Sequence, residues 1–194
     1  MRASAELALV VWVTALLASG SAAADFDKAA LMQLLASVER ASAQFVETRH
    51  SALLTAPLVS RGTLVYKRPD RLEKHVSFPF EARMVLERGQ VTIDNPSRGR
   101  KMTLSIENAP GIAGLVESIR ATRAGDLGAL ERFYKVDVGG SRGAWSLRLR
   151  PHDRELAQYV NAVTVQGAGA RIERIEVVEA SGDRSVMEID EELK

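Results

Sequence analysis

The segment Gly139–Gly143, with Ser141 at its centre, matches the Gly-x-Ser-x-Gly pattern of serine hydrolases, in which the serine is the nucleophile. That chemistry requires a strand before the serine and a helix after it, so that the turn exposes the hydroxyl. Here both flanking segments, Phe133–Val138 and Trp145–Arg150, alternate apolar and polar residues as strands do. The motif is therefore interpreted as a glycine-rich hairpin turn.

Other residue types that could do chemistry are isolated along the chain. There is no Cys, which excludes thiolate metal sites and cysteine nucleophiles. The pair Gly111 and Gly114 resembles a phosphate-binding loop only superficially, because the Lys and Ser or Thr that such a loop requires do not follow it. The acidic run Asp190–Glu192 is expected to be a solvated end of the chain. His50, His75, His152 and Asp153 have no catalytic or metal-ligating partner at a suitable spacing in the sequence. We predict no catalytic residue, no metal and no cofactor, and that the protein is not an enzyme.

The composition is that of an ordinary folded domain. Of 194 residues, 46% are hydrophobic and 26% are charged, and the net charge of +1 gives no reason to expect a nucleic-acid partner. Residues 1–24 form a predicted signal peptide, because Arg2 precedes the apolar run Leu7–Leu17 and the small residues Ser21–Ala24 follow it. We expect residues 25–194 to form a single soluble domain outside the cytoplasm.

The hydrophobic pattern predicts one helix, then strands, with two helical segments in the middle. The first helix is expected to begin at Asp25 or Asp27 and to run to about Ala41, and the central helical segments are Gly111–Arg120 and Asp126–Arg132. Period-2 alternation, interrupted by Pro, Gly and Asn, predicts about ten or eleven strands. The candidate segments are Ala43–His50, Val59–Lys67, Arg71–Phe78, Glu81–Arg88, Val91–Asp94, Lys101–Ile106, Phe133–Val138, Trp145–Arg150, Tyr159–Gln166, Arg171–Val178 and Ser185–Ile189. The fold class is mainly β (α+β), a curved antiparallel sheet or incomplete barrel with helices over its hollow.

Arg68, just before Pro69, is predicted to face the same way as Leu64 and Tyr66, because side chains alternate along a strand. A guanidinium at the rim of an apolar hollow needs acceptors, which helix-end carbonyls or a ligand headgroup would supply. The alternative is a rim arginine in water beside the turn. The spacing favours neither.

Several segments resemble the periplasmic lipoprotein carrier family LolA. Ser42–Thr48 is similar to the family's first strand with its Phe-x-Gln/Glu-Thr pattern, and Gly62–Leu72 looks like its Gly-x-Leu-x-x-x-Arg-Pro strand and turn. Pro79 and the hairpin Val85–Gln90 also fit. The chain departs from the family where Glu73 and Lys74 replace aromatic residues, which extends the expected cargo from lipoproteins to lipids and acylated pigments.

The resemblance implies an unclosed antiparallel barrel around an apolar cavity, closed by a lid of helices, in a monomeric periplasmic protein. It implies transfer of acyl chains of a lipoprotein or lipid from an inner-membrane exporter to an outer-membrane acceptor, with Arg68 holding the lid through helix backbone. The alternatives are a domain that senses stray lipoproteins or lipids and, less favoured, a serine hydrolase. The expected cavity residues are Phe45, Leu64, Tyr66, Leu72, Val76, Met84, Leu86, Met102, Leu104, Ile112, Leu115 and Ile119.

Overall fold

Eleven antiparallel strands form one continuous sheet in the computed structural model, which describes residues 26–106 and 110–193. The spatial order is β6-β5-β4-β3-β2-β1-β11-β10-β9-β8-β7. The predicted leader lies outside the described residues. The strands are β1 (Arg40–His50), β2 (Leu58–Lys67), β3 (Arg71–Phe78), β4 (Ala82–Glu87), β5 (Gln90–Asn95), β6 (Arg100–Ser105), β7 (Tyr134–Ser141), β8 (Ala144–Pro151), β9 (Val160–Ala168), β10 (Arg171–Glu179) and β11 (Arg184–Leu193).

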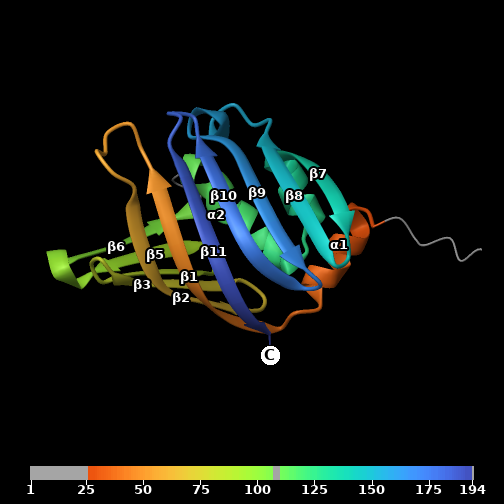
Figure 1. Cartoon of the computed structure of the whole chain (residues 1–194), viewed down its shortest axis with the longest axis horizontal. Coiled ribbons are helices and arrows are strands. Elements are labelled where there is room, and N and C mark those ends of the chain that lie inside the picture. The colour runs from red at the N-terminus through yellow and green to blue at the C-terminus, as the bar shows by residue number, and fades with distance from the viewer. Residues whose placement is uncertain (1–25, 107–109, 194) are drawn as a thin grey trace, which may run out of the picture.

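The first and last strands of the chain are neighbours in the sheet. β1 pairs with β2 on one side and with β11 on the other, so this strand joins a half-sheet of β1–β6 to a half-sheet of β7–β11. The sheet bends strongly but does not close, and β6 and β7 remain as its two edges (Figure 1). The predicted fold class and the eleven candidate strands are confirmed, with shifts of a few residues at their ends.

The described part of the chain also contains three α-helices, which are α1 (Lys28–Ala36), α2 (Pro110–Ala124) and α3 (Leu127–Phe133), and short 3-10 turns at Pro96–Arg98 and Leu156–Gln158. Figure 1 shows α2 behind β9–β11, on the hollow side of the sheet. Asp27 and Asp126 cap α1 and α3, because each carboxylate accepts a hydrogen bond from the first helical turn. None of the described helices is long and apolar enough to cross a membrane.

The hydrophobic core is concentrated in one half of the molecule. The helices pack on β7–β10 and bury, among others, Leu31, Leu35, Leu130, Tyr134, Leu147 and Leu149. The Tyr134 hydroxyl donates to the carbonyl oxygen of Gly114 at 3.1 Å, which fixes the N-terminal part of α2 against this core. Over the half-sheet of β1–β6, the structure describes a smaller buried cluster in which Val38, just before β1, packs with Ala41 and Tyr66, and the last two residues also line a cavity.

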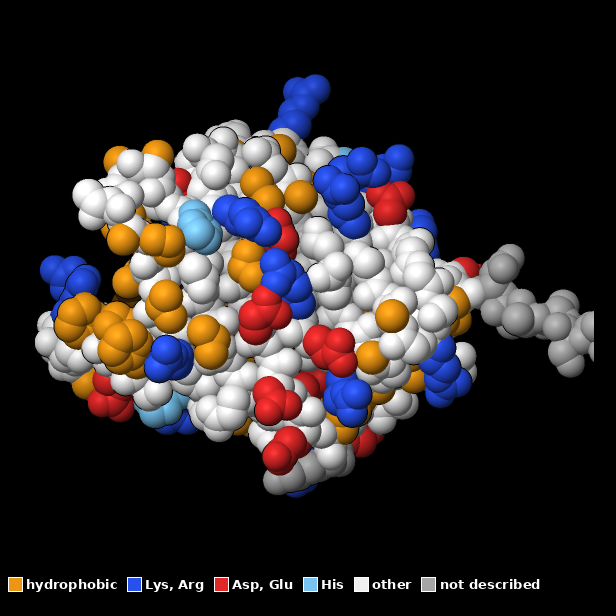
Figure 2. All heavy atoms as spheres, in the orientation of Figure 1, with side chains coloured by type: hydrophobic (Ala, Val, Ile, Leu, Met, Phe, Trp, Pro, Cys, Tyr) orange, Lys and Arg blue, Asp and Glu red, His pale blue; other side chains and the backbone are white. Residues whose placement is uncertain are grey.

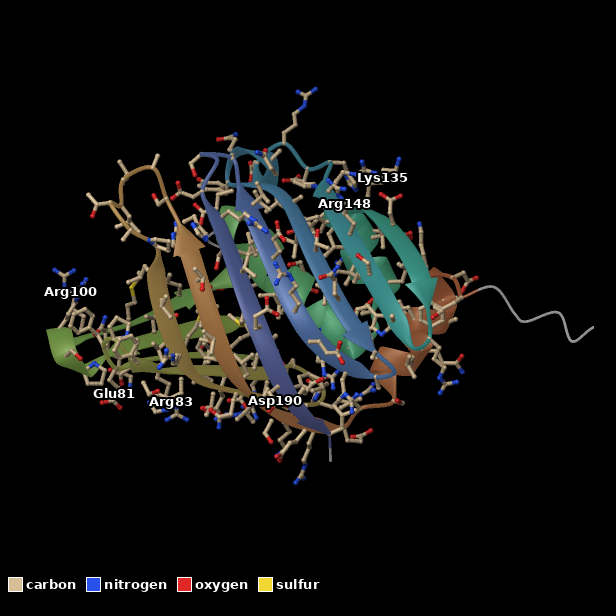
Figure 3. All side chains as sticks on the ribbon, in the orientation of Figure 1. Glu81, Arg83, Arg100, Lys135, Arg148 and Asp190 are labelled. Carbon is tan, nitrogen blue, oxygen red and sulfur yellow. The ribbon has the colours of Figure 1, made fainter. Side chains whose placement is uncertain are left out.

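Charged side chains of both signs are scattered over the convex face of the sheet, as Figure 2 shows. Arg148 on β8 and Asp190 on β11 lie on this exposed face (Figure 3). Ion pairs across neighbouring strands, such as Arg150–Asp137 at 2.5 Å, lie here in water and contribute little to stability.

Two expectations about chain segments are wrong. The first helix ends at Ala36 and not near Ala41, because the Ser37 hydroxyl donates to the carbonyl of Leu34 at 2.7 Å and Arg40 already pairs with Lys67 in the sheet. The acidic C-terminal run is not a solvated tail, since β11 continues to Leu193 and Glu191 is buried opposite Ala43. This second correction places a carboxylate inside the protein.

Candidate functional site

A cavity of about 310 Å³ lies between α2 and the concave face of the sheet. Its walls come from both half-sheets, because β1 and β11 cross its middle, and α2 covers it with Leu115, Val116 and Ile119. The lining also includes Ala41, Ala43, Leu64, Tyr66, Leu72, Met84, Leu86, Val91, Ile172, Ile175, Val177, Met187 and Ile189.

Strand register explains why these residues share one face. Ala41 pairs with Tyr66, Tyr66 with Leu72, Leu72 with Leu86 and Leu86 with Val91, and directly paired residues point to the same side of a sheet. The row therefore lays five hydrophobic side chains across five strands. This row makes one end of the cavity mostly apolar, and the charged side chains of Arg123 and Glu191 also line the cavity, with Arg123 against the Tyr66 ring.

Seven of the expected cavity residues lie in its lining: Leu64, Tyr66, Leu72, Met84, Leu86, Leu115 and Ile119. Phe45 is on the same face of β1 and is 2% exposed, but it is not part of the lining. Val76 and Leu104 are half-buried outside the lining, and Met102 on β6 is 49% exposed. Ile112 belongs to α2, but its side chain lies outside the described part of the chain.

Arg123, near the end of α2, attaches this helix to the sheet. Its side chain is 3% exposed, and Nη1 donates to the carbonyl oxygen of Ala170 at 2.8 Å. Nη2 lies 3.4 Å from Oε1 of Glu191, and the guanidinium carbon is 5.5 Å from the centre of the Tyr66 ring. A single side chain thus connects α2 with β2, β11 and the β9–β10 turn.

Burial perturbs both members of this ion pair. Desolvation raises the pKa of Glu191, although Arg123 and the N–H of Ile172, which donates to Oε2 at 2.8 Å, act in the opposite direction. Desolvation also lowers the pKa of Arg123, against the influence of Glu191 and Tyr66. Each charge is tolerated in the interior because the other is present.

Sequence reasoning missed Arg123 and Glu191. Strict alternation along β11 would have placed Glu191 on the face of Met187 and Ile189, and this is the one signal that could have identified it. For Arg123 the sequence carries no such signal, because its partners come from strands far away in the chain.

The other end of the cavity is polar. Lys74 and Glu47 both line it, and Nζ of Lys74 is 2.5 Å from Oε2 of Glu47. Glu47 also accepts hydrogen bonds from the hydroxyls of Ser185 at 2.6 Å and Ser60 at 3.3 Å. Burial disfavours the charge of Glu47, but the Lys74 ammonium and these hydrogen bonds together lower its pKa below the usual value.

Glu47→Gln is expected to reduce stability at neutral pH, and its deficit relative to the wild type should shrink as the pH falls. A carboxyl whose pKa is lowered by folding stabilises the protein above its unfolded pKa, about 4.3, and this stability is lost as pH falls through the folded value. Denaturant unfolding of both proteins between pH 7 and pH 3 would measure the effect. A deficit that stays constant over this range would contradict the assignment.

Comparison with known families decides the classification. A family model described as outer membrane lipoprotein carrier protein LolA-like matches residues 18–188, which is most of the chain. The protein belongs to this LolA-like family. No curated protein is significantly similar to the chain.

Solved structures similar to this LolA-like protein have low sequence identity to it. A LolA superfamily protein from Nitrosomonas europaea is 12% identical with a TM-score of 0.48, and the match covers 87% of this chain and 94% of that one. A DUF1329 family protein from Desulfovibrio piger is 10% identical with a TM-score of 0.48, over 86% and 90% of the two chains. In the MucA/MucB complex of Pseudomonas aeruginosa, the matched chain is 14% identical with a TM-score of 0.45, over 84% and 56%.

Arg68 of the LolA-like protein contacts the backbone of a helix. Its Nη1 donates to the carbonyl oxygen of Ala36, the last residue of α1, and its main-chain N–H donates to the carbonyl of Glu39 at 3.0 Å. Of the environments considered for this guanidinium, a helix-end carbonyl is the one observed. Its role as a latch stays a prediction, and the helix it holds is α1, whereas Arg123 holds α2.

The hydrolase-like motif of the LolA-like protein forms a two-residue hairpin. Ser141 is exposed and pairs with Ala144, with β7 before it and β8 after it. His152 follows the far end of β8, a strand length of about 26 Å at ~3.3 Å per residue, and its ring contacts the carbonyl of Glu131. Among residues 26–106 and 110–193, no group of three or more His, Asp or Glu side chains is placed to hold a metal ion.

Proposed function

We propose that the protein is a periplasmic carrier that shields an acyl chain of a lipoprotein or other lipid during transfer from the inner to the outer membrane. The observation that supports it is the cavity of about 310 Å³, whose lining is apolar along the row from Ala41 to Val91 and at Leu115, Val116 and Ile119 of α2. Family membership supports the direction of transfer and, as partners, an inner-membrane exporter and an outer-membrane acceptor.

A carrier of this kind has to offset the hydrophobic cost of moving a hydrocarbon chain through water. That cost is about 0.8 kcal/mol per methylene, on the order of 10 kcal/mol for a long acyl chain. Leu72, Leu86 and Ile119 offer the chain an apolar environment in place of the membrane it leaves. Transfer between two apolar environments is nearly neutral, so the chain can be both accepted and released.

The test is to purify the full-length protein from its native periplasm without detergent and to analyse an organic extract by mass spectrometry. We expect an acylated molecule at a stoichiometry near one per protein, absent from an equally purified protein of a different fold. A cavity that carries only water after native purification, and that fails to take up a lipid added in vesicles, would contradict the proposal.

Ala43→Trp is expected to abolish lipid uptake, because Ala43 lines the cavity and an indole there would fill it. Gln44→Trp is the matched control, since Gln44 is the next residue of β1 and is exposed on the opposite face. Uptake would be measured with a fluorescent fatty acid, with circular dichroism to establish that both variants are folded. Equal uptake by the two variants would place the lipid elsewhere.

A further inference from the structure

The polar end of the cavity contains two ion pairs, and β1 supplies the anion of one and the cation of the other. Besides Lys74 and Glu47, the lining includes Arg49 and Glu179, whose Nη2 and Oε1 atoms are 2.8 Å apart. Arg49 also lies 3.3 Å from Oδ2 of Asp183. Lys74 and Glu47 keep side-chain exposures of 23% and 22%, so these charges are sheltered but can be reached.

A purely hydrocarbon ligand would not suit this end. Covering Lys74 and Glu47 with an acyl tail would remove the remaining water from both charges, and burial of an ion pair costs more than its attraction returns unless other polar groups are present. The Lys74 ammonium already lies 5.0 Å from the centre of the Phe45 ring, at the border between the polar and apolar parts. The ligand group that fits here is polar.

The balance of charges narrows the choice of that group. The cluster has two cations, Lys74 and Arg49, in contact with three anions. Glu47 and Glu179 line the cavity, and Asp183 contacts Arg49. A ligand with a single negative charge would pair with Lys74 and leave Glu47 without its cation. A zwitterionic ligand satisfies both, because its anion can lie beside Lys74 or Arg49 while its ammonium lies beside Glu47 or Glu179.

The dimensions of the cavity indicate a ligand with one chain. Its volume of about 310 Å³ is at the low end of the ~300–1,000 Å³ usual for small-molecule pockets. Its lining on β1 runs from Ala41 to Arg49, about 26 Å at ~3.3 Å per residue. The acyl chains of one membrane leaflet span about 15 Å, which leaves length for a headgroup beyond the chain.

We infer that Lys74, Glu47, Arg49 and Glu179 form a headgroup site for a zwitterionic single-chain amphiphile, such as a lysophospholipid with an ethanolamine phosphate headgroup. The acyl chain then lies toward Tyr66, Leu72 and Ile119, and the headgroup lies at the end of β1 near Arg49. This inference rests on the proposed function and specifies its cargo.

The test compares lysophosphatidylethanolamine, lysophosphatidylglycerol and monoacylglycerol with the same acyl chain, each as a competitor of bound N-phenyl-1-naphthylamine. We expect the wild type to bind the zwitterionic lipid at least about tenfold more tightly than the other two, because charge-assisted hydrogen bonds add to chain burial. In Glu47→Leu/Lys74→Met, which removes one of the two ion pairs of the site, the preference should fall while monoacylglycerol still binds.

The matched control is Asp137→Leu/Arg150→Met, which removes an ion pair from the exposed convex face and should keep the wild-type preference. Equal binding of the three lipids by the wild type, tighter binding of the anionic lipid, or an unchanged preference in the cavity double variant would each overturn the headgroup site and leave the carrier function standing. Absence of binding by every lipid would overturn the carrier function as well.

Discussion

Arg123→Met is expected to lower the free energy of unfolding by about 3 kcal/mol at neutral pH, because it leaves the buried carboxylate of Glu191 without its cation. It also removes the hydrogen bond to Ala170 and the contact with Tyr66, which together fasten the end of α2 to the sheet. Urea unfolding would measure the stability, and hydrogen exchange of the amides of α2 would show faster opening of this helix.

A double variant separates the ion pair from simple packing. In Arg123→Met/Glu191→Gln no charge remains, and the glutamine oxygen can still accept the hydrogen bond from the N–H of Ile172. Stability should return to within about 1 kcal/mol of the wild type, since removing both members of a buried pair is often nearly neutral. Equal losses in the single and double variants would show that packing, and not the unpaired charge, is responsible.

The deficit of Arg123→Met should also depend on pH. Burial already raises the pKa of Glu191, and loss of Arg123 removes one of the groups that lower it. A carboxyl whose pKa is raised by folding favours the folded state when it is protonated, so the variant should regain stability as pH falls toward and below the pKa of Glu191. The deficit of Glu47→Gln also shrinks as the pH falls, but there the cause is a loss of stability by the wild type.

Arg68→Leu is expected to release the C-terminal end of α1 and to slow the transfer of cargo. A hydrogen bond from a charged guanidinium to a carbonyl contributes about 1.5–3 kcal/mol, enough to shift an equilibrium between closed and open forms by roughly 10- to 100-fold. Transfer of a bound fluorescent fatty acid to acceptor vesicles would be measured together with hydrogen exchange of α1.

Arg61→Leu is the control for Arg68→Leu, because Arg61 lies on β2, the strand that leads to Arg68, but packs on the exposed ring of Phe78. Arg68→Lys should recover part of the effect, since an ammonium can also donate to the carbonyl of Ala36. Transfer by Arg68→Leu at the wild-type rate would exclude a latch at this position.

The period of the hydrophobic pattern was enough to predict the sheet, because alternation is a local property. At Ala41, however, the hydrophobic period alone predicts the wrong element. Its apolar side chain continues the helical pattern of Leu31, Leu34 and Leu35, but pairing with Tyr66 and Leu193 places it in a strand. Tertiary pairing overrides a short helical pattern when both fit the same residues.

The candidate site was predictable only on its apolar side. Leu64, Tyr66 and Leu72 follow from alternation, and the sequence also indicates that Glu73 and Lys74 place a charge on each face of their strand. What alternation cannot supply is the partner of Lys74, since Glu47 lies two strands away. The same holds for Arg123 and Glu191, which are brought together by the fold.

The position of β11 between β1 and β10 has a consequence for folding of the newly synthesised chain. Glu47 and Ser185, hydrogen-bonded across this seam, are 138 positions apart in the chain. Because the chain is synthesised from its N-terminus, the edge of β1 that pairs with β11 has no partner until β11 has been made. An unpaired strand edge can associate with other chains. Contacts so distant in sequence also make folding slow. A chaperone that covers β1 during this interval would raise the yield of folded protein, and chains cut before Arg184 would aggregate.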